Sequence, residues 1–446
     1  MNLNYIGSVA ERFMKFRSRL ASTGEVASNL FNAISIYVPK SLAVANLESG
    51  SYTPSTVTST SYAVIIVTVD NYRTVLKGNL LTQWQPVFND DTNTDITMYI
   101  IVFDDTTFAP TVTDRSITWA PLTQAFNELF FISLFKTMFS EHYDGSVVSH
   151  ETAQDGDYDD SNYFDMVLAL SALCEAESSL SVCLAEIKVA VPETASTTDS
   201  NACKVLSQTR GAETTHCTTL TGSTEATRAQ YFWGYLNLIG GSHTMCVVNN
   251  GAYMIPIILG KWFEEKNVSG EYVGNKLAKI RLSNSLVKPT GLPSKLDGSV
   301  NLNLIKAFSD NLDDKNVGYF ISIADGSLNN AELIRDRSIS NFPVTAYMMA
   351  KWIDYNTSQD MARFVTDEST LTKPVLANAQ AYQDLQGLLV AKIQKFAGLG
   401  RLENVKINFP PFSEAKVGNT FRGTAVWSAV YIDDLEGVEV SGSITF

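Results

Sequence analysis

The chain has 446 residues, of which 45% are apolar and 18% are charged, and its formal net charge at pH 7 is −14. This length exceeds what one hydrophobic core usually supports, so we expect two or three domains. The acidic balance is the opposite of what phosphate contacts require, which argues against direct nucleic-acid binding. No segment approaches the roughly 18 apolar residues of a membrane span, and the N-terminus lacks the apolar core of a signal peptide. We therefore expect no membrane partner.

The first 60 residues are predicted to form a helix followed by an extended arm. Residues 9–20 (VAERFMKFRSRL) have the spacing of a short basic amphipathic helix, either an ordinary surface helix or an anchor on a membrane surface. Residues 21–60 are rich in Ser, Thr and Asn around one strand-like stretch, 34–38, which Pro39 closes. This composition is typical of an extended arm or an edge strand.

Apolar strands alternate with helical patterns across residues 61–268, which we expect to form one domain. The strands are expected at 62–69, 97–103, 182–189 and 243–248. The helices are expected at 72–81, 123–139, 163–174, 226–238 and 252–265. This alternation predicts a mixed α/β fold with mainly parallel or mixed sheets flanked by helices. Two polar stretches, 141–162 and 193–225, interrupt it and are expected to be exposed insertions.

The five cysteines are irregularly spaced. Cys174 and Cys183 lie in apolar periodic segments and are expected to be buried thiols. Cys203 and Cys217 flank a polar stretch and could form one disulfide in an oxidising setting, whereas reduced cytoplasmic synthesis is the default expectation.

No pattern of metal ligands or catalytic residues stands out. Residues 155–160 (DGDYDD) resemble a calcium loop, but Asp160 stands where the turn needs Gly and Met166 where a bidentate Glu is needed, so a solvated acidic loop is favoured. His243 and Cys246 are three apart on a predicted strand and face opposite sides, so they cannot readily share an ion. The sequence has no GxSxG, HExxH or P-loop motif. We expect no metal, no cofactor and no enzymatic activity.

In the last 27 residues, apolar side chains recur at every second position, as they do in β-strands. The apolar residues on one face of the first strand are Phe421, Ala425, Trp427, Ala429 and Tyr431. After a turn-rich segment at 433–437, the residues on one face are Val438, Val440, Gly442, Ile444 and Phe446. Because chain ends usually fray unless they are held, this last strand must join a sheet, either its own or that of a neighbouring copy.

The order of elements in residues 269–446 is recognisable. Residues 269–278 (SGEYVGNKLA) and 288–293 (KPTGLP) precede a helix-like stretch at 302–312 and a strand at 317–324 (VGYFISIA). The block 335–353 (RDRSISNFPVTAYMMAKWI), a helix at 376–396 and the terminal strands follow. This order resembles the C-terminal domain of contractile tail sheath proteins of bacteriophages of the myovirus type and of related contractile injection systems. Two features differ from that family: Met348 and Met349 stand in place of paired arginines, and the N-terminus reads as helical instead of extended.

The resemblance implies a structural subunit of a phage tail sheath, a helical homo-oligomer that contracts and drives an inner tube through the host envelope. Its partners would be copies of itself, the inner tail tube protein, and baseplate and tail terminator proteins. It would be made in the bacterial cytoplasm and reside in the virion. Residues 269–419 would be the sheath-like C-terminal domain and 420–446 an arm donated to a neighbour. Another virion protein, such as a tube or baseplate component assembled by strand exchange, is the alternative.

Two sets of residues are candidates for these contacts. The inter-subunit strand would use Val438, Val440, Ile444 and Phe446. The predicted helix at 376–396 has Leu385, Leu389, Ile393 and Phe396 at core spacing, with Lys392, Lys395 and Arg401 near its C-terminal end. Those cations either pair with the helix dipole or contact the tube, as the family's C-terminal domain does.

Overall fold

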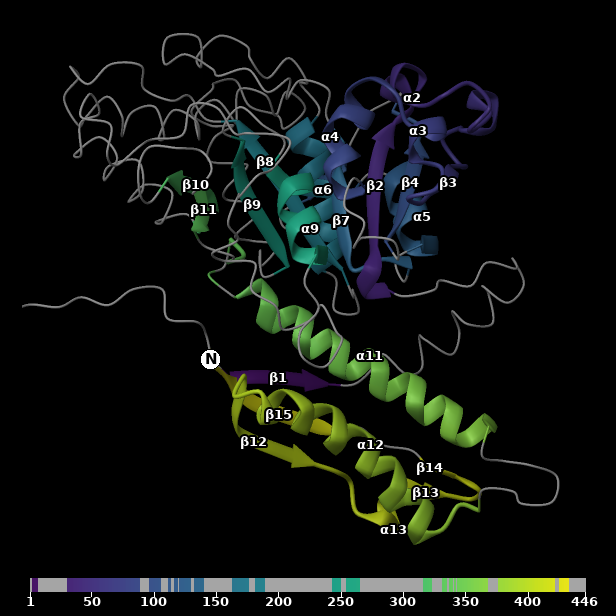
Figure 1. The fold of residues 1–446 in the computed structure, drawn as a ribbon. Coiled ribbons are helices and arrows are strands. Elements are labelled where there is room, and N and C mark those ends of the chain that lie inside the picture. The colour runs from purple at the N-terminus through teal and green to yellow at the C-terminus, as the bar shows by residue number, and fades with distance from the viewer. Residues whose placement is uncertain are drawn as a thin grey trace, which may run out of the picture. The chain divides into compact units, whose positions relative to one another are not determined.

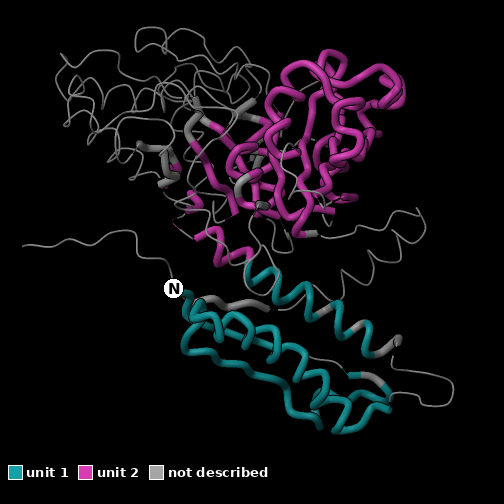
Figure 2. Tube along the Cα trace, viewed as in Figure 1, with its two compact units in different colours: residues 1–25, 349–446 teal, residues 26–348 magenta. Residues whose placement is uncertain are grey.

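The computed structural model divides the chain into two compact units, which are described separately (Figure 2). Unit 1 comprises residues 1–25 and 349–446, and unit 2 comprises residues 26–348. The described residues are 2–6, 30–88, 96–105, 111–113, 116–118, 120–129, 132–139, 163–175, 181–188, 243–249, 254–264, 316–322, 331–334, 337–339, 341, 343–367, 376–421 and 425–432. The domain limits expected at residues 60, 268 and 419 stay predictions.

Unit 2 is built on a six-stranded sheet with the order β3-β4-β2-β7-β8-β9. Its strands are β2 (Ala33–Pro39), β3 (Ala63–Val67), β4 (Thr97–Phe103), β7 (Phe135–Met138), β8 (Val182–Lys188) and β9 (Thr244–Asn249). Every neighbouring pair is parallel except β3 with β4. The five parallel strands follow the spatial order 2-1-3-4-5, which is a doubly wound arrangement. The predicted mixed α/β fold with a mostly parallel sheet is confirmed.

Helices cover both faces of this sheet (Figure 1). They are α2 (Lys40–Asn46), α3 (Tyr72–Val75), α4 (Gly78–Phe88), α5 (Ala120–Leu129), α6 (Tyr163–Glu175) and α9 (Met254–Glu264). Successive residues of β7 show the two layers, since Phe135 meets the ring of Trp262 on α9 at 5.0 Å and Lys136 lies over Phe126 of α5. All seven residues of β2 are buried, as expected for a parallel strand covered on both sides.

The short elements of unit 2 are η1 (Leu30–Asn32), η2 (Pro54–Thr56), the pair β5 (Thr111–Thr113) and β6 (Ser116–Thr118), and the pair β10 (Tyr319–Ser322) and β11 (Ala331–Ile334).

Three sequence predictions in unit 2 are corrected. The stretch 34–38, expected in an arm or an edge strand, lies in β2 between β4 and β7 inside the sheet. The helix expected at 123–139 is α5 followed by strand β7, because the mostly apolar run at 129–135, with Ser133 its one polar residue, has no periodicity that separates helix from strand. The helix expected at 72–81 is two helices, since Gly78 has φ +53 between α3 and the rest of α4. The elements expected at 163–174, 182–189, 243–248 and 252–265 are confirmed as α6, β8, β9 and α9.

Unit 1 contains a three-stranded antiparallel sheet with the order β1-β15-β12. Its elements are β1 (Asn2–Ile6), α12 (Ala379–Gly398), β12 (Leu402–Asn408), α13 (Phe412–Ala415), β13 (Lys416–Val417), β14 (Thr420–Phe421) and β15 (Val426–Tyr431). Helix α11 (Val344–Asp367) begins in unit 2 and continues in unit 1 from Met349. Among the described residues, no helix has both the length and the apolar character needed to cross a membrane.

Candidate assembly surface

The sheet of unit 1 brings together the two ends of the chain. Strand β1 pairs with β15 over five residues, from Asn2 opposite Val430 to Ile6 opposite Val426. On its other side β15 pairs with β12. A strand from residues 2–6 therefore completes a sheet whose other members come from residues 402–431.

The central strand of this sheet anchors it to the helices of unit 1. Trp427, Ala429 and Tyr431 are buried, which confirms the predicted inward face of the strand, while Phe421 and Ala425 are half-buried. The indole nitrogen of Trp427 donates to Oδ1 of Asp354 on α11 at 3.1 Å.

Helix α12 packs through the residues expected at core spacing. Leu389, Ile393 and Phe396 are buried and Leu385 is half-buried. The ring of Phe396 meets Trp352 of α11 edge-on, with centroids 5.3 Å apart. Asn378 caps the helix by accepting from the N–H of Ala381 at 2.9 Å.

The two edges of the sheet differ. On β12 the pairing register shifts between Glu403 and Lys406, and Asn404 has φ +50, as in a β-bulge. Glu403, Asn404 and Lys406 are also exposed. Bulges and charged side chains discourage another strand from pairing with an edge. The outer side of β1 has no partner strand among the described residues, so that side is the more open edge.

Asp354 is a buried carboxyl group beneath this sheet. Burial raises its pKa to about 7, while the hydrogen bond from Trp427 and the charge of Lys351 act in the opposite direction. Oδ2 of Asp354 and Oγ1 of Thr357, one turn further along α11, are buried without a hydrogen-bond partner among the described residues. No feature of the sequence separates Asp354 from the exposed carboxylates, so it was not singled out there.

Near the end of α12, the side chains of Lys392 and Lys395 contact α11, and Arg401 is bound through its backbone. Lys392 forms an ion pair of 2.7 Å with Asp360 of α11. Lys392 and Lys395 lie 5.5 Å and 4.8 Å from the centre of the Trp352 ring. The backbone of Arg401 donates to Phe396 and accepts from Ile432. These contacts join α12 to α11 and to the end of β15.

The net charge is unevenly distributed between the units. Unit 1 contains 13 of the 33 basic and 13 of the 47 acidic residues, so it is neutral. Unit 2 keeps the remaining 20 basic and 34 acidic residues and hence the entire net charge of −14.

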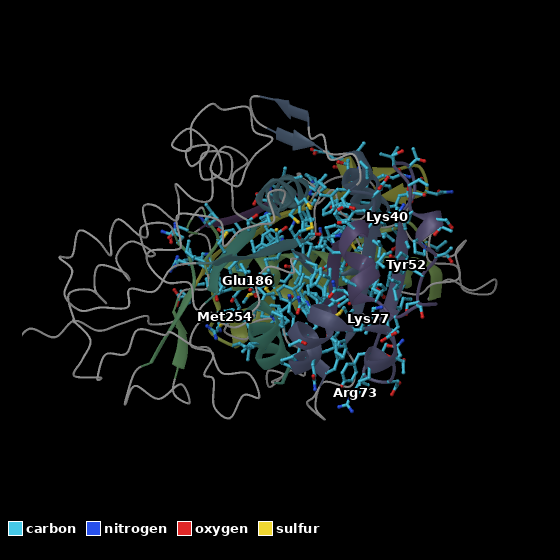
Figure 3. All side chains as sticks on the ribbon, turned by 90° about the horizontal axis from the view of Figure 1, so that it is seen from above. Lys40, Tyr52, Arg73, Lys77, Glu186 and Met254 are labelled. Atoms are coloured by element: carbon cyan, nitrogen blue, oxygen red, sulfur yellow. The ribbon has the colours of Figure 1, made fainter. Side chains whose placement is uncertain are left out.

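The carboxyl ends of the strands in unit 2 are where a doubly wound sheet usually binds a ligand. There, Nζ of Lys40 donates to the carbonyl of Val57 at 2.6 Å, and the backbone N–H and hydroxyl of Ser41 donate to the carboxylate of Asp105. Asp105 thus takes the position that an anion would occupy at the start of α2. Figure 3 shows Lys40 in this region, and shows Glu186 beside Met254, where Glu186 accepts from the N–H of Ile255 at 2.7 Å and caps α9.

A buried lysine in unit 2 was also missed by sequence reasoning, which placed it in a helix. Nζ of Lys136 donates to the carbonyl of Ser133 at 2.9 Å, and burial lowers its pKa to about 8. Cys174 and Cys183 are buried free thiols, as predicted. Within the part of the chain that the structure describes, no cluster of three or more His, Cys, Asp or Glu could hold a metal ion.

Several predicted features lie outside the described residues. They are the strand residues Val438, Val440, Ile444 and Phe446, the cysteines Cys203 and Cys217, the helix at 9–20, the helix at 226–238, and the insertions at 141–162 and 193–225.

Comparison with known proteins gives likenesses to solved structures alone. No family model matches the sequence, and no curated protein is significantly similar to it. A chain of the cryo-EM structure of the anti-feeding prophage (AFP) baseplate, 6-fold symmetrised, is similar to 95% of this chain over 97% of its own length. The two sequences are 9% identical and the TM-score is 0.49.

Proposed function

We propose that this chain is a structural subunit of a contractile tail sheath, which polymerises helically around an inner tube and contracts. The observation that carries the proposal is the sheet of unit 1, in which β15 pairs with a strand from the opposite end of the chain. Residues 7–29, which separate β1 from the next described element, could span at most about 75 Å if fully extended. A strand on such a tether can pair within its own chain or with a neighbouring copy.

Residues 438–446 would supply a second strand for exchange. Val438 to Phe446 alternate between apolar and polar residues. Donation of this strand would form about four to six main-chain hydrogen bonds worth roughly 1 kcal/mol each, together with a buried apolar face. The turn-rich residues 433–437 would let this link tether subunits without fixing the angle between them.

The charge distribution supports assembly through unit 1. Copies that meet through a neutral unit avoid the repulsion that a net charge of −14 produces. Energy for contraction would be stored when subunits assemble in a metastable lattice and released as new contacts form, so no catalytic site is required.

Contact with an inner tube is proposed for Lys392, Lys395 and Arg401. Lys392 already pairs with Asp360, but an ammonium group has three donors and the Lys392 side chain is 24% exposed. A tube contact would therefore add to the contacts within unit 1 instead of replacing them.

Electron microscopy of the purified chain over a wide range of concentrations tests the proposal. Wide hollow cylinders with oblique striations, found in two diameters, are expected for a sheath. Rings or thin tubes would favour the alternative of a baseplate or tube component, and cylinders of a single diameter under all conditions would exclude contraction.

Truncation tests the strand exchange. A chain that ends at Gly437 should keep the circular dichroism of the full chain and lose polymerisation. A matched control, Val417→Ser, changes an apolar residue that is 48% exposed on β13 and should polymerise normally. Normal polymerisation of the truncated chain would overturn the proposed donation.

A further inference from the structure

His243 connects three elements of unit 2. It directly precedes β9, and its Nδ1 lies 2.8 Å from the carbonyl oxygen of Cys174 at the end of α6. The same nitrogen lies 3.5 Å from Oε2 of Glu175. The imidazole ring lies against the ring of Tyr347 in the first turns of α11, with centroids 3.9 Å apart and the ring planes tilted by 34°.

Glu175 holds both the ring and the backbone of His243. Its second carboxylate oxygen accepts from the backbone N–H of His243. The side chain of Glu175 is 6% exposed and that of His243 is 16% exposed, so the pair is shielded from most of the solvent while a proton can still reach the ring.

Each contact is stronger with a protonated imidazole than with a neutral one. A charged ring adds an ion pair to Glu175 and a charge-assisted hydrogen bond to the carbonyl of Cys174. It also adds a favourable interaction with the C-terminal end of α6 and with the face of Tyr347. A neutral ring keeps the hydrogen bond from Nδ1 and the ring contact with Tyr347 but loses these charge-dependent contributions.

The contact between His243 and Tyr347 bears on helix α11. Tyr347 lies in the part of α11 that belongs to unit 2, and the same helix continues into unit 1 from Met349. The segment before the helix is tied to β9 by the hydrogen bond from the N–H of Ile339 to the carbonyl of Thr244, at 3.0 Å. Arg337 in that segment donates to the carbonyl of Asn341. Two titratable side chains contact the His243 ring, Glu175 from α6 and Tyr347 from α11.

We propose that His243 is a proton-dependent lock on the first turns of α11. When the ring is protonated, the imidazolium joins the end of α6, the start of β9 and Tyr347. As the pH rises and the ring loses its proton, the attachment of these turns weakens, and with it the part of α11 that leads into unit 1.

Hydrogen–deuterium exchange of the intact chain at pH 6 and pH 8, corrected for intrinsic exchange rates, tests the lock. We expect protection of amides 347–350, the first with acceptors in the preceding turn, to fall roughly tenfold between pH 6 and pH 8. Amides 97–103 of β4 serve as an internal reference and should not change in this way.

Two variants make the test decisive. His243→Gln keeps a hydrogen-bond donor and should show the lower protection at both pH values. Glu175→Gln keeps the acceptor for the backbone of His243 and should reduce the difference between the two pH values. A wild-type difference that persists unchanged in both variants would overturn the proposal, as would protection of amides 347–350 that does not depend on pH in the wild type.

Discussion

The buried carboxyl group of Asp354 gives a quantitative prediction about unit 1. Its side chain accepts from Trp427, is 8% exposed, and has a pKa raised by burial from 3.8 to about 7. The folded state therefore holds a proton between about pH 4 and pH 7 that the unfolded state has lost. The protonated carboxyl group of Asp354 therefore contributes its full share to the unfolding free energy below about pH 4, and this contribution is lost as the pH rises through about 7.

The size of the effect follows from the shift. A displacement of about three pKa units corresponds to about 4 kcal/mol between the two protonation states. Asp354→Asn removes the titration and keeps an oxygen that can accept from Trp427. Its new amide group lacks an acceptor, which costs about 1–3 kcal/mol, so we expect a net gain in unfolding free energy of roughly 1–3 kcal/mol at pH 8. At pH 5 the variant should be equal to the wild type or slightly less stable.

The measurement must report on unit 1 alone. Amide exchange of residues 426–431, followed across a urea titration at pH 5 and pH 8, gives the unfolding free energy of the sheet. Groups other than Asp354 cancel in the difference between wild type and variant. Asp384→Asn, an exposed carboxyl on α12 that accepts from Gln380, is the matched control and should have no effect at either pH. A difference between Asp354→Asn and wild type that is the same at pH 5 and pH 8 would refute this reasoning.

Three further predictions concern other parts of the fold. Because burial lowers the pKa of Lys136 from 10.5 to about 8, the unfolding free energy of unit 2 should rise by up to about 3 kcal/mol between pH 8 and pH 10.5, and Lys136→Met should abolish that rise in denaturant titrations. Gly78→Ala should cost about 1–3 kcal/mol, because Gly78 has φ +53 and a Cβ would lie 3.0 Å from the carbonyl oxygen of Ala45, whereas Gly387→Ala, with nothing within 4 Å of a Cβ, should be neutral or stabilising in the same thermal-unfolding assay. Charge reversal of both Lys392 and Lys395 should lower the stability of unit 1 by about 1–2 kcal/mol and leave it folded, and unchanged tube binding in co-sedimentation would contradict their proposed role.

Periodicity predicted those elements whose side chains alternate between core and solvent. The inward face of β15 and the core residues of α12 were recognised because Trp427 and Phe396 stand at regular spacing with polar neighbours. Periodicity failed for residues 123–139, because Phe130, Phe131 and Leu134 fit a helix or a strand equally well. In the same stretch Lys136 is buried although it is charged. Burial of a lysine depends on neighbours distant in sequence, which local patterns do not contain.

Long-range pairing accounts for the other misses. Residues 402–408 were not predicted as a strand, because most of their side chains are exposed and the pairing with β15 creates β12. Strand β1 pairs with residues more than 400 positions away, which no local signal specifies. Likewise Asp354 and Asp360 are both aspartates on α11, and only the tertiary structure gives one a buried tryptophan partner and the other a lysine.

The proposed exchange of β1 has a consequence for how a polymer would start. Pairing within one chain and pairing between chains form the same five-residue register with β15, so the hydrogen bonds themselves favour neither. Pairing within one chain does not depend on the concentration of other chains, whereas pairing between copies does, so free chains at low concentration should close on themselves. Exchange between copies then becomes favourable only where further contacts hold neighbours in place. Growth should therefore need either a high concentration of chain or an existing template, and below that concentration a monomer should stay closed.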